Sequence, residues 1–293
     1  MTPVDGAQAA GATTQPERLA EAGEVVLPAG DVDATVAFFV ERLGFRLQMI
    51  MPADSPRVAV LVGHGMRVRL DVAAQPGPGA LRLTVDETEV ALPSIVAPNG
   101  THIEFVAADV PLIVPPLAAR FELTTAAHAA SGMGRAGMRY RDLLPSRLGG
   151  RFIASHIAIP EGGPVPDYVH SHRIRFQMIY CAAGWVRVVY EDQGPPFVMH
   201  AGDCVLQPPG LRHRVLESSP GFEAVEIGCP AEHETYPDHD VQLPTAARRP
   251  DRDFGGQRFV HHVAAGASWA PWRAVGFECR DTGIGDATKG LAG

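Results

Sequence analysis

Three histidines and one glutamine are the residues of this 293-residue chain whose types and spacing best suit chemistry. His170 and His172 stand two residues apart in "HSHRIRFQ", which ends on Gln177, and His213 follows in "GLRHRV". Side chains alternate faces along a strand, so residues two apart point to the same side. Imidazole nitrogens joined by an amide oxygen are suitable ligands for a divalent transition metal. His170 and His172 are therefore candidate ligands of one metal ion, and Gln177 and His213 are further donors in nearby segments.

The neutral amide of Gln177 affects the charge expected at this site. Three neutral imidazoles and an amide leave about two positive charges on a divalent ion, whereas a carboxylate ligand would leave about one. We therefore expect a strong Lewis acid that favours an anionic substrate, an enolate or a hydroxide.

Two further residues are candidates for a catalytic role beside the metal. Tyr168 precedes His170 by two residues and would share its face, where its phenol could act as a hydrogen-bond donor or an acid. A tyrosine packed at the mouth of the site is the alternative. His156 lies on the strand before the cluster and is expected to line the cavity.

The elements that must position these residues have the pattern of short strands. Apolar, β-branched and aromatic runs alternate with Gly, Pro and Asp, as in "RFIASHIAIP", "FQMIYCAAGWVRVVYE", "FVMHAGDCVLQPPG" and "FEAVEIG". This spacing predicts an antiparallel sandwich or barrel. Gln177 is an odd number of residues from both histidines, so the chain must turn near residues 173–175 and return as a neighbouring strand.

The two segments together resemble the signature motifs of the cupin superfamily. The first motif is His-X-His, four residues, Gln177, six residues and Gly184; the second is Gly202, five residues, Pro-X-Gly, two residues and His213. Two positions depart from the family pattern, because Gly163 is one residue too far from His170 and Glu217 stands where Asn is common. The resemblance implies a double-stranded β-helix, or jelly-roll, barrel that binds a divalent transition metal through His170, His172, Gln177 and His213. Fe(II) is favoured, with Mn, Ni, Co, Cu and Zn as alternatives.

The N-terminal part has a different pattern, in which one strand, one helix and three strands follow each other. The helix is predicted from the apolar spacing of Val36, Phe39 and Leu43 and ends at Gly44. The run "LPAGDVDATVAFFVERLGFRL" resembles the opening module of the vicinal-oxygen-chelate, or glyoxalase-like, superfamily, and "APNGTHIEFV" resembles its closing strand. The resemblance implies metal-ligand positions that correspond here to Glu24 and Glu104. The alternative is a shortened structural copy that packs on its neighbour or mediates dimerisation.

These patterns divide the chain into four parts and predict a mainly β protein. Residues 1–21 are expected to be a disordered tail, residues 22–125 the small α+β glyoxalase-like module, 126–245 the cupin barrel and 246–293 a C-terminal arm. "GMRYRD" at 137–142 is echoed by "GFECRD" at 276–281, a displacement of 139 residues. The arm is therefore interpreted as the start of a second cupin repeat in a truncated bicupin; a chance match is the alternative.

Composition limits the partners that the chain can have. A net charge of −8 with a pI near 5.8 argues against nucleic acid or an anionic membrane surface. No apolar run approaches 18 residues, so no membrane span is expected. The four cysteines form no CxxC pair and are read as reduced thiols of a cytoplasmic protein.

Cupins include dioxygenases, isomerases, decarboxylases, lyases and simple binders, so the resemblance leaves the reaction open. We expect a metal-dependent enzyme that acts on a small oxygenated molecule, anionic or enolisable, with an Fe(II) dioxygenase ranked first. The alternatives are a non-redox isomerase, lyase or hydrolase that acts on a sugar acid or carbonyl compound, and a non-catalytic small-molecule-binding cupin. A homodimer is expected, because cupins often pair through their outer strands.

Overall fold

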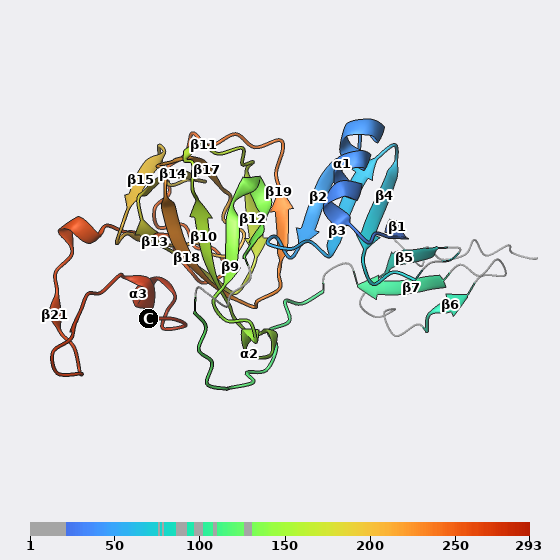
Figure 1. Cartoon of the computed structure of the whole chain (residues 1–293). Helices are drawn as coiled ribbons and strands as arrows, with labels where there is room; N and C mark the ends of the chain where they lie inside the picture. The colour runs from blue at the N-terminus through green and yellow to red at the C-terminus, as the bar shows by residue number, and fades with distance from the viewer. Residues whose placement is uncertain are drawn as a thin grey trace, which may run out of the picture.

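The computed structural model describes residues 22–75, 77, 79–85, 93–96, 102–107, 110–125 and 131–293. Within this part the protein is mainly β, with a barrel on one side and a smaller α+β unit on the other (Figure 1). The expected tail of residues 1–21 lies outside the described residues. No helix in the described ranges combines the length and apolar character that a membrane crossing requires.

The N-terminal unit begins with the predicted order of one strand, one helix and three strands. Asp31 caps the helix by accepting a hydrogen bond from the amide of Ala34 at 2.9 Å, and Gly44 ends it with φ of 71°. The elements are β1 (Ala22–Pro28), α1 (Val32–Leu43), β2 (Arg46–Met51), β3 (Val58–Gly63) and β4 (Met66–Asp71). Strands β5 (Ala80–Val85), β6 (Ile95–Val96) and β7 (His102–Ala107) extend the same sheet beyond β1. The glyoxalase-like resemblance stays a prediction.

The barrel is built from two facing sheets, as its short apolar runs predicted. One sheet has the order β20-β16-β13-β18-β10-β9-β8, and the other contains β15-β14-β17-β12-β19, with β11 beside β17. Inward residues of both sheets form the main core, including Ile157, Val188, Leu211 and Phe222. The strands from β10 to β19 are β10 (Ile153–Ile159), β11 (Gly163–Pro164), β12 (His170–Arg173), β13 (Phe176–Ala183), β14 (Trp185–Tyr190), β15 (Phe197–His200), β16 (Cys204–Leu206), β17 (His213–Ser218), β18 (Phe222–Cys229) and β19 (Glu234–Pro237).

The two units share one continuous sheet. Strand β19 of the barrel pairs with β2 of the N-terminal unit, where Thr235 stands opposite Ile50. Ion pairs such as Arg46–Asp240 and Arg57–Glu232 add polar contacts across the same boundary. The N-terminal unit is therefore fixed against the barrel by backbone pairing.

The C-terminal arm packs on the barrel at two places and leaves it between them. Strand β20 (Val260–His262) pairs with β16, and the short helix α3 (Ile284–Ala287) buries Ile284 against Leu206. Between these contacts, β21 (Ala270–Pro271) and β22 (Glu278–Cys279) form a hairpin that stands away from the barrel (Figure 1). Its aromatic residues Trp269, Trp272 and Phe277 are exposed.

The two echoed hexapeptides occupy similar hairpins. In the first, β8 (Ser131–Met133) pairs with β9 (Arg139–Asp142), and the amide of Met138 bonds to the carbonyl of Arg135. In the second, the amide of Phe277 bonds to the carbonyl of Ala274, the same contact 139 residues later. Met138 is only 4% exposed because β9 pairs with β10, whereas Phe277 is 64% exposed. The interpretation as a second repeat stays a prediction.

Candidate metal centre and its cavity

The three histidines of the predicted quartet converge inside the barrel. His170 and His172 lie on β12, and β17 supplies His213, which pairs directly with His170. One ring nitrogen from each of the three residues lies within 4.8 Å of the others. All three side chains are buried. The alternation of faces along β12 brings His170 and His172 to one point, as the sequence predicted.

Each imidazole is held through its Nδ1 atom. His170 Nδ1 lies 2.9 Å from the carbonyl oxygen of Tyr168, and His213 Nδ1 lies 3.0 Å from that of Leu211. A carbonyl can only accept, so both Nδ1 atoms are protonated donors, and Nε2 keeps its lone pair. His172 Nδ1 lies 2.9 Å from the hydroxyl of Thr235. His170 Nε2 is buried and has no hydrogen-bond partner among the described residues, as a metal ligand without its ion would.

The surroundings of the histidines keep them uncharged. Burial lowers the pKa of His170 and His172 well below the ordinary value, and it lowers the pKa of His213 to about 4. The positive charge of Arg135 adds to the effect on all three. Neutral imidazole is the form that binds a metal, so the donor set fits a divalent cation at neutral pH.

Gln177 lies on β13 in the cavity wall and is bonded to a carboxyl that the sequence reading missed. Its amide nitrogen donates to Glu226 Oε1 at 2.6 Å, which leaves the amide oxygen as the atom available to a metal. Burial raises the pKa of Glu226. An acidic residue therefore stands one hydrogen bond behind the amide of Gln177.

The cavity beside the histidines has a volume of about 100 Å³. An engineered apolar cavity of ~150 Å³ holds benzene, so this one suits a molecule of fewer heavy atoms. Most of its wall is apolar, including Ile153, Ile157, Val188 and Phe222. Polar groups in the wall, besides the metal-site candidates, are Asp54, Arg135, Tyr140, Tyr190, Gln207, Glu226 and His233.

Glu226 and His233 are functional candidates that the sequence reading did not assign. Glu226 follows Phe222 and Ala224 on the inward face of β18, so the period of two in "FEAVE" was an available signal. His233 is buried, and its ring centroid lies 5.3 Å from that of His172. Its Nδ1 lies 3.1 Å from the carbonyl of Pro230, so Nε2 is the acceptor. Burial lowers the pKa of His233.

Both predicted catalytic residues lie outside the cavity wall. Ile153, Ile157 and Ile159 of β10 face inward, so His156 faces the other side, where its Nε2 lies 3.0 Å from Glu223. The expectation that His156 lines the cavity is therefore wrong. Tyr168 is packed with its ring against the edge of His170, at 5.8 Å between centroids, and holds that histidine through its backbone carbonyl.

The proposed second metal site in the N-terminal unit is occupied by arginines. Glu24 is ion-paired with Arg67 and Arg82, each at 3.1 Å, and Glu104 lies 3.3 Å from Arg82. Cations already neutralise both carboxylates. Across the described residues, the three-histidine cluster is the one group of His, Cys, Asp and Glu side chains close enough to hold a metal. The expectation of a Glu24–Glu104 site is corrected accordingly.

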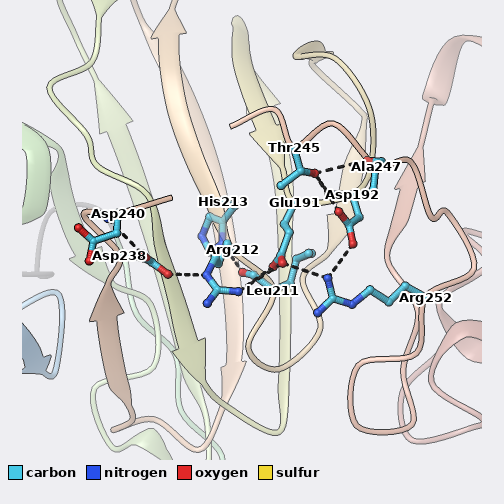
Figure 2. Close-up of polar contacts among 10 residues, drawn as sticks. All are labelled: Glu191, Asp192, Leu211, Arg212, His213, Asp238, Asp240, Thr245, Ala247 and Arg252. Carbon is cyan, nitrogen blue, oxygen red and sulfur yellow. Dashed lines mark hydrogen bonds and ion pairs between the residues drawn. The ribbon is translucent and has the colours of Figure 1, made fainter. Parts of the chain in front are cut away.

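An ion-pair network supports the chain next to His213. Figure 2 shows Arg212 bonded to Asp238 at 2.6 Å and to Glu191 at 3.3 Å, while Arg252 bonds to Glu191 and to Asp192. Both carboxylates of the Glu191–Asp192 pair are nearly buried. The network fixes the strand ends around Leu211, whose carbonyl holds His213.

Comparison with known proteins agrees with the barrel. Residues 155–226 match the family model described as Cupin domain. Similar solved structures include an RmlC-like cupin from Shewanella frigidimarina (21% identity, 38% of this chain and 93% of that chain, TM-score 0.32). The polyketide cyclase RemF from Streptomyces resistomycificus (19%, 43% and 90%, 0.35) and a mutant of Bacillus subtilis oxalate decarboxylase OxdC (15%, 44% and 38%, 0.30) are also similar. The search of curated proteins gave no match. The family match covers residues 155–226, which lie within the barrel.

Proposed function

We propose that the barrel is a metal-dependent enzyme that moves protons on a small, enolisable carbonyl compound. His170, His172 and His213 would hold a divalent transition metal, with the amide oxygen of Gln177 as fourth ligand. The observation that carries the proposal is the convergence of three histidines, with Nδ1 of two of them tied to backbone carbonyls, beside the buried carboxyl of Glu226.

The bound metal would supply Lewis acidity that polarises a carbonyl oxygen. The other roles belong to the chain itself. Gln177 fixes the carboxyl of Glu226, which can hold a proton at the oxygen that is not bonded to the amide. His233 Nε2 can accept a proton from the same cavity, because its Nδ1–H is already donated to Pro230. An acid and a base beside one small cavity support isomerisation, or addition and elimination.

An Fe(II) dioxygenase, ranked first from the sequence, becomes the second candidate. The apolar wall favours it, since O2 and a small organic substrate would share such a space. Glu226 and His233 make the dioxygenase less favoured than the proton-transfer enzyme, because a non-redox reaction of that kind uses a proton donor and a proton acceptor. A binding protein without turnover is the third candidate.

Deuterium exchange separates these candidates. The full chain is loaded in turn with Fe(II), Mn(II), Co(II), Ni(II) and Zn(II), and a panel of small hydroxycarbonyl compounds is followed by NMR in D2O without oxygen. We expect metal-dependent exchange at the carbon next to the carbonyl. Glu226→Gln should retain the metal and lose the exchange, while His156→Gln, outside the cavity, should behave as wild type. Turnover that requires oxygen would favour the dioxygenase. A chain that binds no metal would contradict both the proton-transfer enzyme and the dioxygenase.

Three organisational features belong to the same proposal. A homodimer is supported by the exposed aromatic residues of the β21–β22 hairpin. A glyoxalase-like origin of the N-terminal unit is supported by the order of its first five elements. A cytoplasmic location is supported by four free cysteines, of which Cys181, Cys204 and Cys229 are buried.

A further inference from the structure

The N-terminal unit contributes part of the wall of the barrel cavity. Pro52, Ala53 and Asp54 follow β2 directly, and all three line the cavity that also contains Glu226 and His233. The cavity is therefore closed by residues from both units.

This wall segment is held firmly at both ends. Before it, β2 pairs with β19 at Ile50 and Thr235; after it, the amide of Arg57 bonds to the carbonyl of Met51 at 2.9 Å. Arg147 bonds to Asp54 at 3.2 Å and to Asp142 at 3.3 Å. The guanidinium of Arg147, which also bonds to Asp142, therefore anchors Asp54 to the barrel.

One oxygen of Asp54 remains available to a ligand. Arg147 bonds to Oδ2, and no other described residue donates a hydrogen bond to this carboxylate. Burial raises the pKa of Glu226, and the negative charge of Asp54 acts in the same direction, as expected for two acids that share a cavity.

The charges of the wall indicate an uncharged ligand. Asp54 and Glu226 are acidic, and the one arginine among the lining residues, Arg135, is already paired with the buried carboxylate of Asp167. Apart from the metal that the histidines would hold, the lining residues offer an anion no cation that lacks an acidic partner. A hydroxyl group, in contrast, can donate to Asp54.

We propose that Asp54 is a substrate-positioning residue that accepts a hydrogen bond from the hydroxyl of a small, neutral hydroxycarbonyl compound. This inference rests on the proposed function, because it places the substrate beside the metal. The volume of about 100 Å³ limits the substrate to a few heavy atoms. The N-terminal unit thus determines which molecules the barrel accepts.

Two isosteric probes test this inference on the full chain loaded with Co(II), whose visible absorption reports binding near the metal. Hydroxyacetone and 2-butanone differ only in a hydroxyl in place of a methyl group. A hydrogen bond to a charged acceptor changes affinity by about tenfold or more, so wild type should prefer hydroxyacetone by that factor. Asp54→Ala should remove the preference, and Asp54→Asn, which keeps a weaker neutral acceptor, should retain part of it.

Asp142→Ala is the matched control, because it removes another partner of Arg147 without altering the cavity wall. It should keep the wild-type preference. The inference is overturned if wild type shows no preference, if Asp54→Ala and Asp142→Ala behave alike, or if pyruvate, an anion of similar size, binds more tightly than hydroxyacetone. Each of these results leaves the metal site intact. Failure of wild type to bind Co(II) overturns the proposed function itself, and this inference with it.

Discussion

Thr235 connects the two units to the metal site, and its replacement by valine tests that connection. Thr235 is 0% exposed, its hydroxyl lies 2.9 Å from His172 Nδ1, and its backbone pairs with Ile50 of β2. Valine has nearly the same shape but no oxygen, so His172 loses the group that orients its ring. Loss of such a partner typically lowers metal affinity 10- to 100-fold, or by about 1.4 to 2.7 kcal/mol.

The affinity is measured by competition with a chromophoric chelator for Zn(II) or Co(II), at a temperature where circular dichroism shows both proteins folded. Thr235→Ser is the control, because it keeps the hydroxyl and should bind metal within about threefold of wild type. If Thr235→Val held the metal as tightly as wild type, the hydroxyl would have no part in orienting His172, and the reasoning from its position would be refuted.

Three further predictions concern the ligands, the pH dependence and the hairpin. His172→Ala or His213→Ala should abolish stoichiometric metal in elemental analysis; a variant that retained it would contradict the ligand assignment. Because His213 has a folded-state pKa of about 4, the unfolded metal-free chain binds more protons between pH 4 and 6.5, so stability falls as pH is lowered through that window. Urea unfolding should show a loss of about 3 kcal/mol from this residue, reduced in His213→Gln. Trp272→Ser with Phe277→Ser should convert a dimer to a monomer in light scattering, and unchanged mass would exclude the hairpin as the interface.

The sequence predicted the parts of the site that depend on local geometry. The two-residue spacing of His170 and His172 determines their common face in any regular strand. The predicted turn after Arg173 is present, but it returns Gln177 on β13 of the facing sheet and not on the strand next to β12. Helix α1 was equally predictable, because Gly44 adopts the left-handed conformation that ends a helix. These features need only a few consecutive residues.

Features that depend on distant segments were missed or wrong. The orientation of His156 depends on the register of β10 against β9 and β18, which no local pattern reveals. Glu24 was expected to bind a metal, but Arg67 and Arg82 reach it from strands far along the chain. Asp54 belongs to a different unit of the chain from the cavity that it lines, so its role follows only from the pairing of β2 with β19.

The pairing of β2 with β19 also determines which fragment of the chain is suited to expression. A fragment cut to the family match, residues 155–226, would lack β19 and leave β12 without that neighbour. A fragment cut to the whole barrel would expose β19 as an unpaired edge strand, which invites aggregation. It would also lose the wall formed by residues 52–54 and open the metal site to bulk water. The smallest fragment suited to biochemistry therefore starts at β1, well before the segment that matches the family model.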